Sequence, residues 1–391
     1  MLNTALSPWP SFTQEEADAV SRVLLSNKVN YWTGSECREF EKEFAAFTGT
    51  QYAVAVANGT LALDVALKAM GIGAGDDVVV TSRTFLASAS CIVTAGANPV
   101  FADVDLNSQN ISAETVKTAL TPNTKAVIVV HLAGMPAEMD GIMDLAKEHD
   151  LWVIEDCAQA HGAKYKGKSV GSIGHVGAWS FCQDKIMTTG GEGGMVTTND
   201  KELWRKMWSY KDHGKSYDAV YHREHAPGFR WLHESFGTNW RMMEMQAVIG
   251  RIQLKCMPEW TARRQAHAAK LAESLGKFAG IRLIEVADYI EHAQYKFYAF
   301  VKPEHLKDGW TRDRIVGELN ARKVPCYQGS CSEVYLEKAF DNTPWRPKER
   351  LKNAVELGNT SLMFLVHPTL TDDEIAFCKE HIEAVLAEAT A

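Results

Sequence analysis

The feature that most limits the fold of this chain is a regular alternation of β-rich runs with helical patterns over residues 52–156. Strands are predicted at Tyr52–Ala57, Asp77–Thr81, Pro99–Val104, Lys125–His131 and Leu151–Glu155. Their Val- and Ile-rich composition with little polar alternation is typical of parallel strands covered on both faces. Helices are predicted between them, at Leu61–Met70, Ala87–Ala95, Ala113–Leu120 and Pro136–His149. The alternation predicts a doubly wound, mostly parallel α/β sheet.

The pattern changes after residue 199. A helix is predicted at Lys201–Tyr210, and the stretch Lys211–Asn239 is then polar, aromatic and without a clear period. An irregular segment of that length inside a compact domain is usually functional or an interface. Two helices, Arg241–Lys255 and Trp260–Leu275, precede a mixture of strands and helices. We therefore expect a large unit of residues 1–255 and a smaller C-terminal α+β unit of residues 256–391.

Charge and composition exclude several classes of function. The chain has 41 Lys and Arg against 49 Asp and Glu, a net charge of −8, and it has no long basic run, so a nucleic-acid partner is not expected. No apolar run reaches membrane-spanning length and no secretory signal is visible, so we expect a cytoplasmic protein that binds no membrane. The eight cysteines form no C-x-x-C pair, which predicts reduced thiols and no metal site.

Two groups that could carry chemistry follow predicted strand ends. Asp156 ends the strand that begins at Leu151, and Lys185 comes just after a further strand predicted at Ala178–Phe181. A buried carboxylate is costly unless a cation meets it, and a lysine with a lowered pKa is a nucleophile. Both side chains could face one pocket at the carboxyl edge of the sheet. A structural ion pair, or an aspartate that caps the next helix, explains the spacing about as well.

A third signal is Asn58-Gly59-Thr60, which lies between the first predicted strand and its helix. Backbone N–H groups at a helix start, a glycine that permits close approach and a neighbouring hydroxyl form a phosphate cradle, although Asn and Thr are also ordinary helix caps. No Walker or G-x-G-x-x-G motif is present, which argues against nucleoside triphosphates and dinucleotides. Phe85 follows the second strand and could offer an aromatic face to a planar ligand; taken alone, it would be assigned to the core.

Together, these groups match the requirements of pyridoxal 5′-phosphate (PLP). The cofactor needs a phosphate cradle, an aromatic platform, a lysine for its Schiff base and a carboxylate against its pyridine nitrogen. The carboxylate keeps that nitrogen protonated, so that the ring accepts electrons when the substrate Cα proton leaves.

The chain resembles the DegT/DnrJ/StrS family of PLP-dependent sugar aminotransferases from about Tyr31 to its C-terminus. Five separated segments carry the resemblance, at 32–49, 57–63, 154–161, 178–199 and 237–250. The family has the aspartate-aminotransferase fold, PLP fold type I. The resemblance implies that Asp156 meets the pyridine nitrogen, that Gln159 binds the ring hydroxyl and that Lys185 forms the Schiff base. It also implies that Ser180, Gly59 and Thr60 contact the phosphate and that Phe85 covers the ring.

The segment Asn239-Trp240-Arg241 is similar to the family's N-Y-R segment, with Trp240 in place of the usual tyrosine. The resemblance implies that Asn239 reaches the phosphate bound to a neighbouring subunit, which predicts a homodimer with shared active sites. One branch of the family has histidine at the Schiff-base position and catalyses a dehydration. Because this chain has Lys185, we expect a transaminase.

The activity that the resemblance implies is transfer of an amino group from an amino acid, glutamate, to a nucleotide-linked keto-deoxy sugar, in the biosynthesis of amino sugars for polysaccharides. Trp32, His131 and Arg241 are candidates for contacting substrate, with core packing, a structural histidine and an ion pair as their alternatives. A cyclitol or aminobenzoate-type precursor is an alternative substrate. A non-catalytic regulatory protein is a further alternative, against which the intact Lys185 and Asp156 argue.

Overall fold

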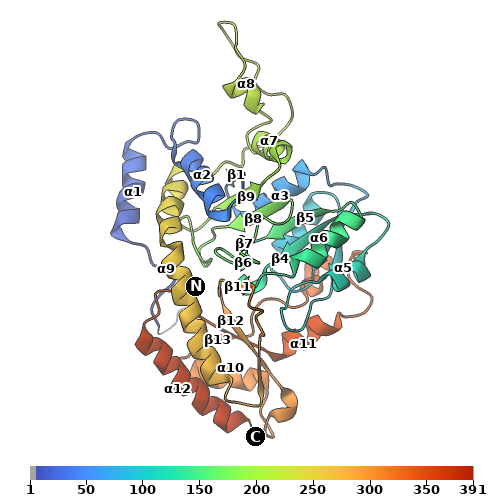
Figure 1. Cartoon of the computed structure of the whole chain (residues 1–391), viewed down its shortest axis with the longest axis vertical. Helices are drawn as coiled ribbons and strands as arrows, with labels where there is room; N and C mark the ends of the chain where they lie inside the picture. The colour runs from blue at the N-terminus through green and yellow to red at the C-terminus, as the bar shows by residue number, and fades with distance from the viewer. Residues whose placement is uncertain (1–5, 391) are drawn as a thin grey trace.

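The structure is a computed structural model that describes residues 6–390 and contains two main β-sheets (Figure 1). The larger sheet has seven strands in the order β1-β9-β8-β5-β4-β2-β3. Their bounds are Tyr52–Val56, Gly194–Thr198, Val176–Ser180, Trp152–Asp156, Thr124–Val130, Asp77–Thr81 and Asn98–Ala102. All neighbours from β8 to β3 pair in parallel, and only β9 runs antiparallel to both of its neighbours. The predicted mostly parallel α/β sheet is confirmed.

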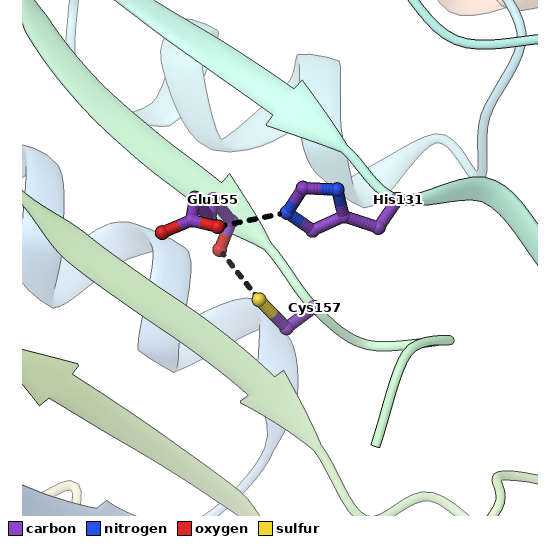
Figure 2. Close-up of side chains that lie close together, drawn as sticks. All are labelled: His131, Glu155 and Cys157. Carbon is purple, nitrogen blue, oxygen red and sulfur yellow. Dashed lines mark hydrogen bonds and ion pairs between the residues drawn. The ribbon is translucent and has the colours of Figure 1, made fainter. Parts of the chain in front are cut away.

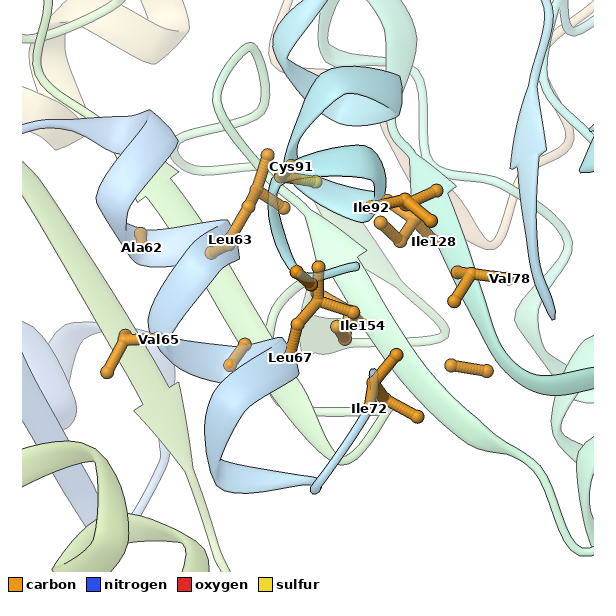
Figure 3. Close-up of a cluster of buried hydrophobic side chains, with 14 of the residues drawn as sticks. Ala62, Leu63, Val65, Leu67, Ile72, Val78, Cys91, Ile92, Ile128 and Ile154 are labelled. Carbon is orange, nitrogen blue, oxygen red and sulfur yellow. The ribbon is translucent and has the colours of Figure 1, made fainter. Parts of the chain in front are cut away.

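Helices cover both faces of this sheet because successive strand residues point to opposite sides. Val78 and Val80 of β2 pack on one side with the helices α3 (Gly59–Ala69), α4 (Ala87–Thr94) and α7 (Lys201–Tyr210). Figure 3 shows the part of this layer in which Leu63 and Leu67 of α3 meet Ile128 and Ile154 of the sheet. Val79 packs on the other side, over α5 (Ala113–Ala119) and α6 (Met139–Glu148). The core is therefore a layer of branched aliphatic side chains on each face.

Two of the predicted helices differ in how well their first residues match the structure. The helix predicted from Ala113 begins there, and the Ser112 hydroxyl caps it by accepting the Thr115 N–H. The prediction that Pro136 opens α6 was wrong, because α6 begins at Met139. A short 3₁₀ turn, η1 (Leu132–Gly134), precedes it, and Ala133 and Gly134 both have positive φ there. The chain thus turns sharply at the end of β4 before it can enter the helix.

The two helices predicted at 241–255 and 260–275 are a single helix, α9 (Glu244–Leu275), which contains Pro258. Its first half packs against α1 (Gln14–Leu25) and α2 (Glu36–Thr48), and its second half against α12 (Asp372–Ala389) (Figure 1). Packing along both halves outweighs the hydrogen bond that the proline removes. The predicted boundary at residue 255 falls inside this helix, and the division into two units stays a prediction.

The smaller sheet is antiparallel, in the order β10-β12-β14-β13, with bounds Ile281–Leu283, Phe297–Val301, Ser361–Phe364 and Cys326–Tyr327. The helices α9, α10 (Arg312–Ala321) and α12 enclose its core, and α11 (Lys352–Thr360) contacts β12. Three further 3₁₀ turns lie at Pro303–His305, Val334–Leu336 and Lys338–Phe340. A third, short sheet pairs β11 (Ile290–Glu291) with β6 (Lys164–Tyr165), which pairs with β7 (Lys168–Ser169), and so joins the two parts of the molecule.

The irregular stretch predicted at 211–239 contains one short helix, α8 (Tyr217–Tyr221), and projects from the body of the molecule (Figure 1). Three aromatic side chains of the following loop are exposed: Phe229, Trp231 and Phe236. Within residues 6–390, no helix has both the length and the apolar character needed to cross a membrane.

Candidate active site

The residues predicted for the cofactor meet in one pocket of about 620 Å³. The pocket lies at the carboxyl ends of β4, β5 and β8 and beside the start of α3, where α/β sheets bind their ligands. Its walls include Gly59, Thr60, Phe85, Asp156, Gln159, Ser180 and Lys185. Of the cofactor residues predicted from the sequence, only Asn239 lies elsewhere.

Asp156, the last residue of β5, is buried and firmly oriented. Its Oδ2 atom accepts a hydrogen bond from the Ser88 hydroxyl at 2.7 Å, and its Oδ1 atom accepts the Ala158 N–H at 3.1 Å. The Thr84 hydroxyl bonds in turn to Ser88. Burial raises the pKa of Asp156, and the Ser88 and Ala158 hydrogen bonds offset part of this rise. A cationic ligand group next to Asp156 would keep the carboxylate ionised.

Gln159 lies one turn beyond Asp156 on the same wall. Its Oε1 atom accepts the backbone N–H of Ala133 at 2.8 Å. This contact assigns the oxygen to the protein side of the amide and leaves the two N–H groups of the amide nitrogen for a ligand. The turn η1 thus orients the glutamine.

The start of α3 forms the opposite end of the pocket. The Asn58 side chain caps the helix by accepting the Leu61 N–H at 3.0 Å, so Gly59 and Thr60 lie in the first turn. A Cβ atom on Gly59 would lie 2.5 Å from the Cβ atom of Ser180, so only glycine permits this contact. Two hydroxyl groups and the free N–H groups of a helix start therefore gather at one point, as an anion requires.

Lys185 lies in the loop between β8 and β9. Its Nζ atom is 3.8 Å from the Asp184 carboxylate and 5.5 Å from the ring centre of Tyr295. The indole N–H of Trp9 donates to the Lys185 carbonyl oxygen at 2.8 Å and holds the main chain of the loop. The Lys185 amine therefore has two neighbours, the Asp184 carboxylate from its own loop and the Tyr295 ring from the C-terminal part.

Phe85 is 70% exposed and lines the pocket. Phe85 is therefore not a core residue, which is the assignment that it would receive if considered alone. An exposed ring on a pocket wall is available to stack on a planar ligand.

The residues predicted to contact substrate, Trp32, His131 and Arg241, do not line this pocket. Trp32 packs edge-on against Trp208 at the side of the core. Arg241 forms an ion pair with buried Asp212, in which Nη1 and Oδ1 are 2.7 Å apart. An ion pair was the alternative considered for this arginine. Asn239 is exposed and pairs through its backbone with Asp212. Contacts of Trp32, Arg241 and Asn239 with substrate or cofactor stay predictions.

His131 is fully buried, and both of its ring nitrogens have protein partners. Figure 2 shows the one on Glu155. Its Nδ1 atom accepts the Ala137 N–H, so its Nε2 atom donates to Glu155 at 2.9 Å. The Glu155 carboxylate also accepts three backbone N–H groups, from Gly171, Ile173 and Gly174. Of the two roles considered for His131, a substrate contact and a structural histidine, these hydrogen bonds support the structural one.

His131, Glu155 and Cys157 have ligand types and spacing compatible with a metal ion, since their ligand atoms lie within 4.8 Å of one another. The Glu155 oxygens, however, are already used by four donors. Burial also raises the pKa of the Cys157 thiol well above its usual range, and a metal needs the thiolate. The geometry is that of a hydrogen-bonded brace that fixes the end of β5.

Sequence reasoning missed four residues of the site: Ser88, Trp9, Asp184 and Tyr295. Ser88 lies in the first turn of a helix that follows a strand end, and this position was a usable signal. Asp184 directly precedes Lys185 and was a usable signal as well. Trp9 and Tyr295 are more than 100 positions from Lys185 in the sequence, and no local pattern marks them.

A lysine, a buried carboxylate and an anion cradle at the strand ends of this sheet define a PLP-dependent enzyme of fold type I. The chain belongs to the DegT/DnrJ/EryC1/StrS aminotransferase family, whose sequence model matches residues 10–383. It is therefore a PLP-dependent aminotransferase, and the expected family, fold and cofactor are confirmed.

Three relatives illustrate the similarity. A crystal structure of an aminotransferase from Psychrobacter cryohalolentis superposes with a TM-score of 0.96 at 64% identity, covering 98% of this chain and 99% of the other. GDP-perosamine synthase of Escherichia coli O157:H7 is 41% identical over 377 residues, which are 95% of this chain and 96% of that protein. L-glutamine:2-deoxy-scyllo-inosose aminotransferase of Streptomyces fradiae is 36% identical, over 82% of this chain and 78% of that protein.

The side chains of the pocket fit the cofactor. The buried carboxylate of Asp156 is suited to a protonated ring nitrogen, and the glycine-dependent contact between Gly59 and Ser180 forms a cradle for a phosphate. Lys185 lines the wall between these two ends, and Phe85 presents an exposed ring.

Proposed function

We propose that this enzyme transfers an amino group from glutamate to a nucleotide-linked keto-deoxy sugar, in the biosynthesis of amino sugars for polysaccharides. The observation that carries the proposal is that Lys185 and Asp156 line one pocket whose far end is the anion cradle of Gly59 and Thr60. The sugar is proposed because GDP-perosamine synthase, which is named for a nucleotide-linked sugar, is similar along nearly the whole chain.

Bound PLP supplies the electron sink that makes a substrate Cα proton acidic. In this proposal, Lys185 Nζ removes and returns that proton as a general base and acid. Asp156 holds the ring nitrogen protonated, and the Ser88 hydrogen bond keeps its carboxylate pointing into the pocket. Gln159 donates an amide N–H to the ring hydroxyl, because its oxygen is already taken by Ala133.

The anion cradle holds the cofactor phosphate at a fixed distance from Lys185. Thr60 and Ser180 donate their hydroxyl groups, and the helix start adds backbone N–H groups. Phe85 covers one face of the ring and excludes water from it. Each of these residues orients the cofactor without taking part in proton transfer.

A substrate diphosphate needs cations that the pocket itself does not provide. Among the residues that line the pocket in the described part of the chain, Lys185 is the single Lys or Arg, whereas Asp156, Asp184 and Glu192 are acidic. We infer that a second copy of the chain supplies the missing groups and that the enzyme is a homodimer with shared active sites.

The projecting loop after α8 supports this dimer. Phe229, Trp231 and Phe236 are 76%, 78% and 99% exposed, and exposed aromatic side chains gathered on one loop mark an interaction surface. Arg223 and Arg230 lie on the same loop. Asn239 lies at its base, where contact with a partner's phosphate is expected.

A cyclitol ketone is the second candidate substrate, because the similar Streptomyces fradiae enzyme is named for an inosose. The cytoplasm is the proposed location, and the eight free cysteines, most of them buried, support a reducing compartment.

One screen tests the proposal. Purified enzyme is incubated with glutamate and a panel of nucleotide-linked 3-keto and 4-keto sugars, with an inosose as comparison, and aminated product is followed by mass. Glutamate-dependent amination of a nucleotide-linked sugar is expected. Amination of the inosose alone would favour the second candidate, and a protein that remains colourless with added PLP would overturn both.

A further inference from the structure

Asp184 lies on the pocket wall between Lys185 and a tyrosine from the C-terminal part of the chain. Its Oδ1 atom is 3.8 Å from Lys185 Nζ, and its Oδ2 atom accepts a hydrogen bond from the Tyr295 hydroxyl at 2.5 Å. The two carboxylate oxygens therefore have different partners, and the hydrogen bond on one side fixes where the other oxygen points. An acid held in this way presents its charge at a defined place beside the amine.

Tyr295 is itself held firmly. Its side chain is buried, and its backbone N–H donates to the carbonyl oxygen of Ala133 at 2.9 Å. The N–H of Ala133 is the group that binds Gln159. The turn η1 thus connects two sides of the pocket: through Gln159 it orients a predicted cofactor contact, and through Tyr295 it orients the acid beside Lys185.

The charges around these groups favour an ionised Asp184. Burial alone would raise the pKa of Asp184, but the Lys185 charge and the Tyr295 hydroxyl outweigh it, with Lys296 adding to them, and lower the pKa. Further groups whose charges interact with Lys185 are Asp156, Cys182, His161 and Lys296. Of these, Asp156 lies at the ring-nitrogen end of the proposed cofactor site, whereas Asp184 adjoins the amine itself.

We propose that Asp184 and Tyr295 are positioning residues for Lys185: the carboxylate holds the lysine nitrogen against the pocket wall, and the tyrosine hydroxyl holds the carboxylate. The inference rests on the proposed function, since it concerns the nitrogen that would bond to PLP and move the proton. It gives the C-terminal part of the chain a direct connection to that nitrogen, through a residue about 110 positions away in the sequence.

The test uses the PLP-loaded dimer and four variants: Asp184→Asn, Asp184→Glu, Tyr295→Phe and the double variant Asp184→Asn/Tyr295→Phe. Tyr289→Phe is the matched control, because its hydroxyl donates to Glu138 at 2.7 Å on the surface. For each protein, the absorption band of the bound cofactor is titrated against pH, and kcat and KM for glutamate are measured.

Removal of the Asp184 charge should lower the midpoint of the titration by about 0.2–0.7 pH unit, because an adjacent carboxylate favours the protonated form of the nitrogen and the Asp184 side chain is 60% exposed to solvent. The same variant should lower kcat roughly 10-fold through loss of alignment, with little change in KM. Asp184→Glu keeps the charge and should stay near the wild-type midpoint. Tyr295→Phe should lower kcat in the wild-type background and have no further effect in the Asp184→Asn background.

An unchanged midpoint in Asp184→Asn would overturn the inference, and so would a Tyr295→Phe effect of equal size with and without the carboxylate. Either failure is distinguishable from failure of the proposed function, because the titration needs no sugar substrate. A wild-type protein with no cofactor band would refute the proposed function itself.

Discussion

Glu155 and Asp156 are consecutive residues of β5 whose carboxylates lie on opposite faces of the sheet. Asp156 meets Ser88 on the pocket side, and Glu155 meets His131 on the other side. The alternation of side chains along a strand produces this separation. Asp156 therefore faces the pocket, while Glu155 anchors the strand to the loop at 171–174. A separate substitution tests each of the two acids.

We expect Asp156→Asn to lower kcat roughly 10–100-fold, the value of one hydrogen bond to a charged group, about 1.5–3 kcal/mol. The amide keeps the shape of the side chain but cannot pair its charge with a protonated ring nitrogen. Steady-state kinetics with saturating PLP measure this effect, and exposed Asp308→Asn is the control. Wild-type kcat in Asp156→Asn would remove Asp156 from the cofactor site.

Glu155→Gln should destabilise the protein by about 3 kcal/mol at pH 7, because the amide nitrogen cannot accept the N–H groups that a carboxylate oxygen accepts, which leaves buried donors without a partner. Burial alone would raise the pKa of Glu155, but the hydrogen bond from His131 and those from the backbone N–H groups lower it below its usual value. A carboxyl group with a lowered pKa stabilises the fold at pH values above 4.5 and loses this contribution as the pH falls through its folded-state pKa.

The difference in unfolding free energy between wild type and Glu155→Gln should therefore shrink in acid. Urea unfolding between pH 7 and pH 3 measures it, with exposed Glu349→Gln as the control. A difference that stays constant over this range would show that the charge of Glu155 does not contribute.

Gly59→Ala should weaken binding of PLP and cost about 1–3 kcal/mol of stability, because the new Cβ atom would lie 2.5 Å from the Cβ atom of Ser180. Gly73→Ala is the matched control, since its Cβ atom would lie 3.8 Å from its nearest neighbour. Fluorescence titration with PLP and thermal unfolding measure the two effects. Equal behaviour of both variants would contradict the close-packed cradle.

The proposed sharing of active sites between subunits predicts complementation between two inactive proteins. Lys185→Ala and Asn239→Ala are each expected to have little activity. A mixed dimer, however, contains one site with both native residues, so a random mixture should regain about a quarter of the wild-type activity. The measurement is activity after the two proteins are unfolded and refolded together. No gain over the separate proteins, in a mixture shown to contain mixed dimers, would place Asn239 outside the partner's site.

The sequence was sufficient to predict the parallel sheet and seven of the residues that line the pocket. Buried parallel strands have continuous Val- and Ile-rich sequences, and ligands bind at their carboxyl ends. Asp156 and Lys185 were found in this way, because each lies at or just after a strand end, whereas Gln159 and Ser180 were assigned through the family resemblance. The same logic placed Gly59 and Thr60 at a helix start.

Contacts that depend on tertiary packing could not be predicted. Pro258 indicates a break between two helices, but α9 continues through it because both of its halves are packed. Tyr295 reaches Asp184 because its stretch of the C-terminal part packs against η1. His131 has the position of a substrate ligand at a strand end, and only the structure shows that both of its nitrogens are in use.

The short pairing of β6 with β11 combines main-chain hydrogen bonds with side-chain contacts. Lys164 and Glu291 form an ion pair at 3.1 Å, and Tyr165 and Ile290 are buried in the same core cluster. Peptide hydrogen bonds do not depend on residue identity, but the burial of Tyr165 and Ile290 does. Tyr295 lies only a few positions downstream, so apolar side chains at these two positions help to place the residue that reaches Asp184.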